Sequence, residues 1–173
     1  MPELVLPDTS YFESFLASHH EWAGAHEAGT GIYANADLES VEGFAAVVDH
    51  LKRSETQVET PGYVTCTFRW IVQDRDYLGS IALRHELNEY LAFRGGHVGY
   101  GVRPSARGRG LAAWALGNML PVAHEHGLDR VLITCDDDNV ASYRTIEKNG
   151  GVLESVRVDE TGQPFRRYWI DVA

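Results

Sequence analysis

The spacing of apolar and polar residues predicts alternating strands and helices from the first residues onward. A short apolar strand is expected at residues 4–6, followed by a helix whose apolar side carries Phe12, Phe15, Leu16, His19 and Trp22. A second helix is expected at residues 38–53, where apolar residues again recur at helical spacing. The Gly- and Ala-rich stretch between them, residues 24–35, is expected to be a loop that could cover a substrate site.

Three antiparallel strands are predicted in the middle of the chain, at residues 64–72, 78–83 and 96–102. The turn Asp74-Arg75-Asp76 joins the first two strands into a hairpin. The polar run at residues 84–90 marks the point at which the chain is expected to leave the sheet before the third strand.

The C-terminal part is predicted to contain two helices and three strands. Leu111, Ala115, Met119 and Val122 fall on one face of a helix, which Pro121 is expected to kink or end. A strand at 130–135, a helix at 139–148 and strands near 151–158 and 165–171 complete the order. The sequence has no internal repeat, low-complexity tract or linker, so residues 1–173 are expected to form one domain of the α/β (α+β) class.

A Gly-rich loop, Arg107-Gly108-Arg109-Gly110, lies between the strand at 96–102 and the helix that begins at Leu111. Glycines let backbone N–H groups approach a ligand closely, and the first turn of a helix has unpaired N–H groups at the positive end of its dipole. With the two arginines, this arrangement suits a phosphate or pyrophosphate group. The alternative is a tight turn in which the glycines only relieve backbone strain.

Two other phosphate motifs fit this loop less well. A Walker A loop would need Gly-Lys-Ser/Thr, but the chain has Gly110-Leu111-Ala112. The spacing Gly108-x-Gly110-x-x-Ala113 matches a loose dinucleotide fingerprint, with Asp129 near the expected acidic position. However, Asp129 precedes the strand at 130–135 instead of ending one, and too little chain follows for a doubly wound sheet.

Composition and charge narrow the class of protein. The chain has 173 residues, 44% of them hydrophobic, which favours a folded globule with a sizeable core. A formal net charge of -10 argues against nucleic acid as a partner and is compatible with a cationic amine substrate. Cys66 and Cys135 are interpreted as reduced core thiols of a cytoplasmic protein, and neither a signal peptide nor a membrane span is indicated. The histidines on predicted helices lack metal-ligand spacing, so no metal site is expected.

Two motifs resemble those of the GNAT N-acetyltransferases. The segment Arg107-x-x-Gly110-x-Ala112, after a strand that ends in Val102-Arg-Pro, resembles the loop of that family that binds the pyrophosphate of acetyl-coenzyme A. The segment from Asn139 to Gly151, with Lys148-x-Gly150 at its end, resembles the family's later motif beside the pantetheine arm. Val98-Gly99-Tyr100 and Ala141-Ser142 are similar to the branch that acetylates ribosomal-protein N-termini. The resemblance implies the GNAT fold, with a mixed, mostly antiparallel central sheet of six to seven strands and about four flanking helices.

The resemblance also implies a reaction and a set of coenzyme-binding residues. The reaction is direct acetyl transfer from acetyl-coenzyme A to a primary amine of a small molecule or peptide, without a metal. Asn139 is assigned to a side-chain bond with the pantetheine arm, and the strand end near Val102 to backbone pairing with the same arm. The full set expected to bind the coenzyme is Tyr100, Val102, Arg107, Gly108, Arg109, Gly110, Leu111, Ala112, Asn139 and Ser142.

The expected acid and base depart from the family pattern. Ile146 occupies the position where many members have a proton-donating tyrosine. Ser142 is therefore the candidate acid or hydrogen-bond donor, although a serine at a helix start also makes local backbone bonds. His97 stands where the similar branch often has a glutamate, and it is the candidate base, with His85 and Glu86 as second choices. The alternative for His97 is a histidine satisfied at a strand edge.

Two questions stay open at this point. A non-catalytic acyl-coenzyme A-binding regulatory domain of the same fold is the alternative function, and Ile146 is the residue that favours it. The acceptor is also open, because an acidic chain suits polyamines, aminoglycosides and peptide N-termini equally. A homodimer is compatible with the resemblance.

Overall fold

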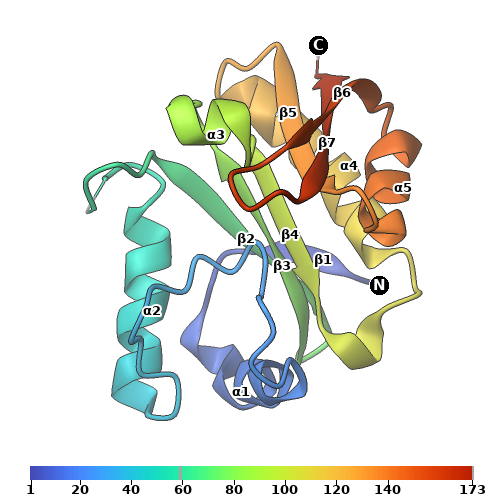
Figure 1. Ribbon diagram of the computed structural model, residues 1–173. Coiled ribbons are helices and arrows are strands. Elements are labelled where there is room, and N and C mark those ends of the chain that lie inside the picture. Colours follow the sequence, from blue (N-terminus) through green and yellow to red (C-terminus); the bar gives the residue numbers. More distant parts are fainter. Residues whose placement is uncertain (59, 173) are drawn as a thin grey trace.

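The computed structural model describes residues 1–58 and 60–172, and its strands form two antiparallel sheets (Figure 1). In the first sheet, β1 (Glu3–Val5), β2 (Cys66–Gln73), β3 (Asp76–Arg84) and β4 (Val98–Val102) lie in chain order. In the second sheet, β7 (Pro164–Asp171) lies between β5 (Arg130–Asp136) and β6 (Val152–Val158).

Helices cover both faces of these sheets. On one side lie α1 (Phe12–Glu21), which follows the 3-10 turn η1 (Thr9–Tyr11), and α2 (Val41–Arg53). On the other side lie α4 (Leu111–Glu125), which follows the 3-10 turn η2 (Pro104–Ala106), and α5 (Val140–Lys148). The short helix α3 (Glu89–Phe93) connects β3 to β4. Side chains cap three of these helices at their first turns, because Ser40, Asn88 and Asn139 each accept a hydrogen bond from the backbone N–H three residues later.

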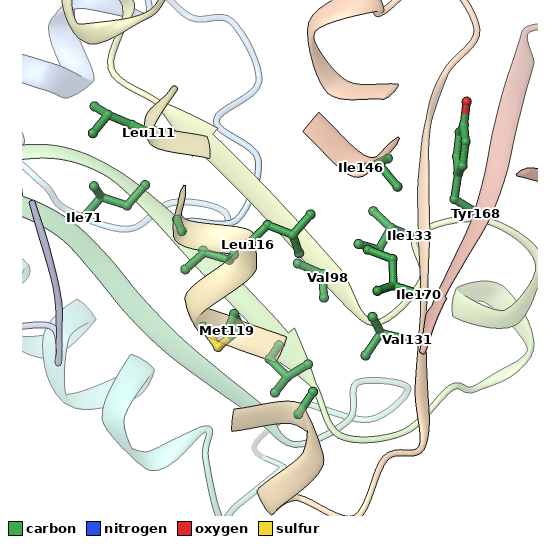
Figure 2. Packing of buried hydrophobic residues seen from close by; sticks show 14 of the residues in the cluster. Ile71, Val98, Leu111, Leu116, Met119, Val131, Ile133, Ile146, Tyr168 and Ile170 are labelled. Carbon is green, nitrogen blue, oxygen red and sulfur yellow. The ribbon is translucent and has the colours of Figure 1, made fainter. Parts of the chain in front are cut away.

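Alternation along the strands divides the apolar side chains between two cores. Trp70 of β2 belongs to the core beneath α1 and α2, whereas the next residue, Ile71, belongs to the core beneath α4. Figure 2 shows the second core, in which Leu116 and Met119 of α4 face the strands. Because this core takes residues from both β4 and β5, α4 holds the two sheets together from one side.

The fold class expected from the sequence is confirmed, with three differences among the described residues. The sheet consists of two parts, with four and three strands. Five α-helices are present instead of about four, because α3 occupies a stretch interpreted as a polar connection; a five-residue helix is too short to give a periodic apolar pattern. Of the two effects expected at Pro121, a kink or an end, the end is contradicted, because α4 continues to Glu125 with Ala123 buried in the core beyond the proline.

The two sheets meet at one short seam. Gly96 pairs with Ile133 in an isolated bridge, and the N–H of His97 donates to the carbonyl of Leu132 at 2.7 Å. The Leu132 N–H in turn donates to Nδ1 of the His97 ring at 2.8 Å. Gly96 has a φ of +64°, and a Cβ there would lie 2.4 Å from the Leu132 carbonyl oxygen, so the seam needs glycine at this position.

Replacing His97 should therefore destabilise the fold. His97→Leu would leave the buried Leu132 N–H without an acceptor, and we expect the free energy of unfolding to fall by about 1–3 kcal/mol. His97→Asn is the matched control, because its side-chain oxygen can take the place of Nδ1 and should retain most of that stability. Chemical denaturation at pH 7 measures both, and equal stability of the two variants would contradict the role of the ring nitrogen.

The same substitution should change the acid dependence of stability. Burial, with the nearby Arg84 charge, lowers the pKa of His97 from 6.5 to about 4, so the folded state holds the neutral ring. As the pH falls below about 6.5, the unfolded chain takes up a proton that the folded chain does not, and wild-type stability should decrease until the pH reaches about 4. The decrease in the free energy of unfolding that comes from protonation of His97 should be absent from His97→Asn.

Candidate functional site

A large cleft of about 1800 Å³ passes between β4 and β5 and takes its walls from both faces of the sheets. The gap between the two strands, which we call the opening, is lined by Val98 to Tyr100 of β4 and by Ile133 to Cys135 of β5. One half of the cleft, on the side of α4 and α5, is lined by the Gly-rich loop and by the first turns of these helices. The other half lies on the side of α1 and α2 and is lined by the loop at 25–32, by residues 62–64, and by α3. We call these the loop half and the open half.

The edge of β4 that faces this opening is not paired with another strand, although the Val102 carbonyl accepts a bond from Arg107 Nε. The Arg84 N–H donates to the His97 carbonyl and the Arg103 N–H donates to the Leu78 carbonyl, so between these two bonds residues 99 and 101 point their backbone groups toward β3. The alternation of an antiparallel ladder then turns the N–H and C=O groups of Val98, Tyr100 and Val102 toward the cleft. This edge can pair with an extended amide-bearing ligand as a further strand would.

The Gly-rich loop and the start of α4 form a candidate anion site in the loop half. Gly108 and Gly110 have φ values of +76° and +77°, and a Cβ on either would meet no atom within 4 Å. Within the described chain, the backbone N–H groups of residues 108–113 donate to no other residue. These N–H groups, at the positive end of a 15-residue helix, are suited to bind a pyrophosphate.

The two arginines of the loop take different directions. Arg107 lines the cleft, donates from Nε to the Val102 carbonyl at 3.2 Å, and holds its guanidinium 4.7 Å from the centre of the Trp22 ring. Arg109 instead bonds Gln73 at 3.0 Å and does not line the cleft. Every other residue expected from the sequence to bind the coenzyme lies in the cleft wall.

Two hydroxyl groups meet where the cleft passes between the sheets. The Tyr100 hydroxyl lies 2.9 Å from Ser142 Oγ and also donates to the Ser142 carbonyl at 3.2 Å. The Ser142 N–H is bonded by the Asn139 side chain, which fixes the first turn of α5. Burial raises the pKa of Tyr100 well above its usual range and the pKa of the neighbouring Cys135 to about 11, so both groups keep their protons at neutral pH.

The loop at residues 24–35 lies directly on β4 in the open half. A Cβ on Gly29 would be 2.6 Å from the Gly99 carbonyl oxygen, and a Cβ on Gly101 would be 2.6 Å from the Ala28 carbonyl oxygen, so the close contact depends on these glycines. The loop brings Glu27 into the cleft wall, where its side chain is 9% exposed and bonds Nδ1 of His19.

The residues proposed as base from sequence lie outside this cleft. His97 is 5% exposed, does not line the cleft, and uses its Nδ1 in the seam between the sheets; the geometry therefore contradicts its role as the base. His85 does not line the cleft either, because its ring stacks on His126 at 3.8 Å and bonds Thr67. Glu86 is exposed and also lies outside the cleft.

Sequence patterns did not indicate the bonded pair Glu27 and His19 in the cleft wall. His19 was counted on the apolar side of α1, and Glu27 lies in a loop with no periodic pattern. Only the expectation that the loop at residues 24–35 covers a substrate site pointed to this region of the chain. Ile146 is fully buried in the core beneath α4 and α5 and presents no group to the cleft.

The described residues give no sign of a metal centre or a membrane span. No group of three His, Cys, Asp or Glu side chains in the described chain is arranged to hold a metal ion. Of the helices described, none is both long enough and apolar enough to cross a membrane.

Comparison with known proteins gives a family match and a set of similar folds. The sequence model of the acetyltransferase (GNAT) domain matches residues 14–152. No curated protein sequence matches the chain significantly.

Several solved structures share the fold at low sequence identity. An N-acetyltransferase from Staphylococcus aureus Mu50 is 15% identical and superimposes with a TM-score of 0.68, over 100% of this chain and 99% of that chain. The acetyltransferase from Salmonella typhimurium that modifies the N-terminal serine of ribosomal protein L7/L12 is 17% identical, with a TM-score of 0.66 and coverage of 99% and 95%. The microcin C7 self-immunity acetyltransferase MccE, solved with acetyl-CoA and AMP, is 15% identical, with a TM-score of 0.66 and coverage of 98% and 92%.

Proposed function

The chain belongs to the GNAT acetyltransferase family, and from this premise we propose that it transfers the acetyl group of acetyl-CoA directly to a primary amine of a small molecule or peptide. The observation that carries the proposal is the continuity of one cleft, which joins an anion site at a helix N-terminus, an unpaired strand edge and a second, open half. The presence of acetyl-CoA in one of the similar structures supports the same coenzyme.

The loop half fits the coenzyme from its phosphates to its thioester. The N–H groups of residues 108–113 bind the pyrophosphate, with Arg107 adding charge. The pantetheine arm pairs with the free edge of β4 at Tyr100 and Val102, and the first turn of α5 at Asn139 flanks it. This path brings the thioester to the opening between the sheets, where Ser142 and Tyr100 lie.

Each group in the opening then has a defined part in the transfer. The amine nitrogen, entering from the open half, attacks the thioester carbonyl carbon, and the C–S bond breaks as the amide bond forms. Glu27, held by His19, accepts the proton that the amine loses. Ser142 donates a hydrogen bond to the departing thiolate, which takes its proton from water. The Tyr100 hydroxyl, which keeps its proton, orients Ser142 and is a hydrogen-bond donor rather than an acid.

The alternative function is a non-catalytic acyl-CoA-binding domain, and the burial of Ile146 is the observation that favours it. The two functions differ in a single assay, the release of free thiol from acetyl-CoA across a panel of amines, amino acids and peptides. An enzyme releases thiol in proportion to added acceptor. A binding domain retains affinity for acetyl-CoA but releases no thiol with any acceptor.

The pyrophosphate assignment predicts a large effect at Gly110. A valine there would be strained at a φ of +77° and would place its side chain over the N–H groups that bind the anion, so the dissociation constant for acetyl-CoA should rise by about 100-fold or more. Gly127→Val is the matched control, since Gly127 has a φ of +80°, equally open surroundings and no place in the cleft. Calorimetric titration measures both variants, and an unchanged affinity in folded Gly110→Val would refute the assignment.

The proposed base predicts a loss of rate without a loss of coenzyme affinity. Glu27→Gln removes the proton acceptor but keeps the shape of the side chain, so kcat should fall by about 100-fold or more while acetyl-CoA binding is retained. Glu39→Gln is the control. Glu39 makes a similar bond, at 2.9 Å, to His20, the residue after His19, but it lies on the surface and outside the cleft. If Glu27→Gln keeps the wild-type rate, the proton leaves by another route.

A further inference from the structure

We propose that the open half of the cleft binds a carboxylate of the acceptor on Arg84, so that the substrate is a primary amine that also carries a carboxylate and an apolar portion, as apolar α-amino acids do. This inference rests on the proposed acetyl transfer and adds the chemical class of its acceptor. It is carried by three observations: the fixed position of the Arg84 guanidinium, its lack of an acidic partner, and the apolar walls around it.

Arg84 is held in place beside the start of β4. It is the last residue of β3, and its Nη1 donates to the carbonyl oxygens of Gly95 and Gly96 at 3.2 and 3.1 Å. These two bonds fix one side of the guanidinium group. Its Nη2 lies only 3.7 Å from where a Cβ on Gly99 would be, so no side chain of β4 separates the charge from the cleft. The thioester is proposed to lie at the same stretch of β4.

The charge of Arg84 has no acidic partner within the described chain. Three other arginines line the cleft: Arg94 pairs with Asp136 at 2.8 Å and with Asp159, Arg107 lies over Trp22 in the loop half, and Arg144 is exposed on α5. Within the described chain, the side-chain hydrogen bonds of Arg84 run from Nη1 to two neutral carbonyls, which leaves the Nη2 and Nε donors available. A half-buried guanidinium with open donors favours an anion, and its planar fork matches a carboxylate.

The walls near Arg84 are mostly apolar. The apolar side chains that line the open half include Phe68 of β2, Ala82 of β3, Ile32 of the loop and Leu91 of α3. Glu27 supplies the acidic group of the same half. An acceptor with a carboxylate, an amine and an apolar side chain would therefore find a complementary group for each of its parts, whereas a polyamine would bring its positive charges close to Arg84.

The experiment compares acceptors that share an apolar side chain and differ in the carboxylate, with rates expressed per concentration of the neutral amine. Leucine, leucinamide and 3-methylbutylamine, together with the corresponding phenylalanine series, are tested for thiol release from acetyl-CoA. We expect kcat/KM to be about 10- to 100-fold higher for the amino acid than for its amide or its decarboxylated amine, which is the range for losing a charge-assisted hydrogen-bonded pair. Acetylated product is identified by mass spectrometry.

Variants of Arg84 connect this preference to the residue. Arg84→Met should lower kcat/KM for leucine by about 10- to 100-fold and leave leucinamide nearly unchanged, so that the preference disappears. Arg84→Lys keeps the charge and can still bond the Gly95 and Gly96 carbonyls but lacks the fork, and it should show an intermediate preference. If Arg84→Met fails to fold, the reduced preference of Arg84→Lys decides the question.

The outcomes separate this inference from the proposed function. Equal or faster acetylation of the amides and simple amines overturns the carboxylate site while the acetyltransferase activity stands. An equal loss for leucine and leucinamide in Arg84→Met also overturns it, because Arg84 would then act through the Gly95 and Gly96 carbonyls that it holds and not on the acceptor's carboxylate. Absence of thiol release with every amine, in a protein that binds acetyl-CoA, overturns the proposed function and the inference together.

Discussion

The separation of β4 from β5 is the constraint on which the rest of the structure depends. Two strands can separate inside a folded protein only if other groups bond the backbone N–H and C=O groups that lose their partners, and if packing keeps the strands apart. Here the seam at Gly96 and His97 closes one end, with the imidazole ring as acceptor for the Leu132 amide where the ladder stops. The core beneath α4 spans both sheets and keeps them at a fixed separation.

The same constraint explains how one cleft can serve two substrates. Strand alternation directs Tyr100 toward α5, and the glycines at 99 and 101 face the loop that covers the other side. Absence of side chains at those two positions allows the covering loop to approach and leaves the Arg84 charge beside the strand. The coenzyme and the acceptor can therefore reach the same opening from opposite faces.

In the proposed acceptor site, local charge is expected to matter more than net charge. The formal charge of -10 suggested cationic acceptors, but surface charges are screened over about 10 Å at moderate ionic strength. Within the cleft, the acceptor meets the few groups that line it, and Arg84 is among the nearest to the proposed thioester position. Composition gives only the overall electrostatic potential of the molecule, whereas the binding of an acceptor depends on individual, partially buried charged groups.

The sequence predicted the elements with strong periodicity and failed where tertiary contacts decide. Helix α2, the hairpin of β2 and β3, and the cap at Asn139 follow from apolar spacing and local chemistry alone. The direction of the His97 ring could not be derived, because a strand alternates and the sequence does not say which side meets a cleft. Glu27 acquires its place from the contact of Gly29 with Gly99, two residues far apart in the chain, and no local pattern carries that information.

The central claim is that the coenzyme occupies the free edge of β4 and the first turn of α4. Amide hydrogen exchange, followed residue by residue with and without acetyl-CoA, tests it most directly. The account predicts slower exchange on binding at Tyr100, at Val102 and at residues 108–113, with the amides of β6 unaffected. Unchanged exchange at these β4 and loop amides in a protein saturated with acetyl-CoA would contradict it.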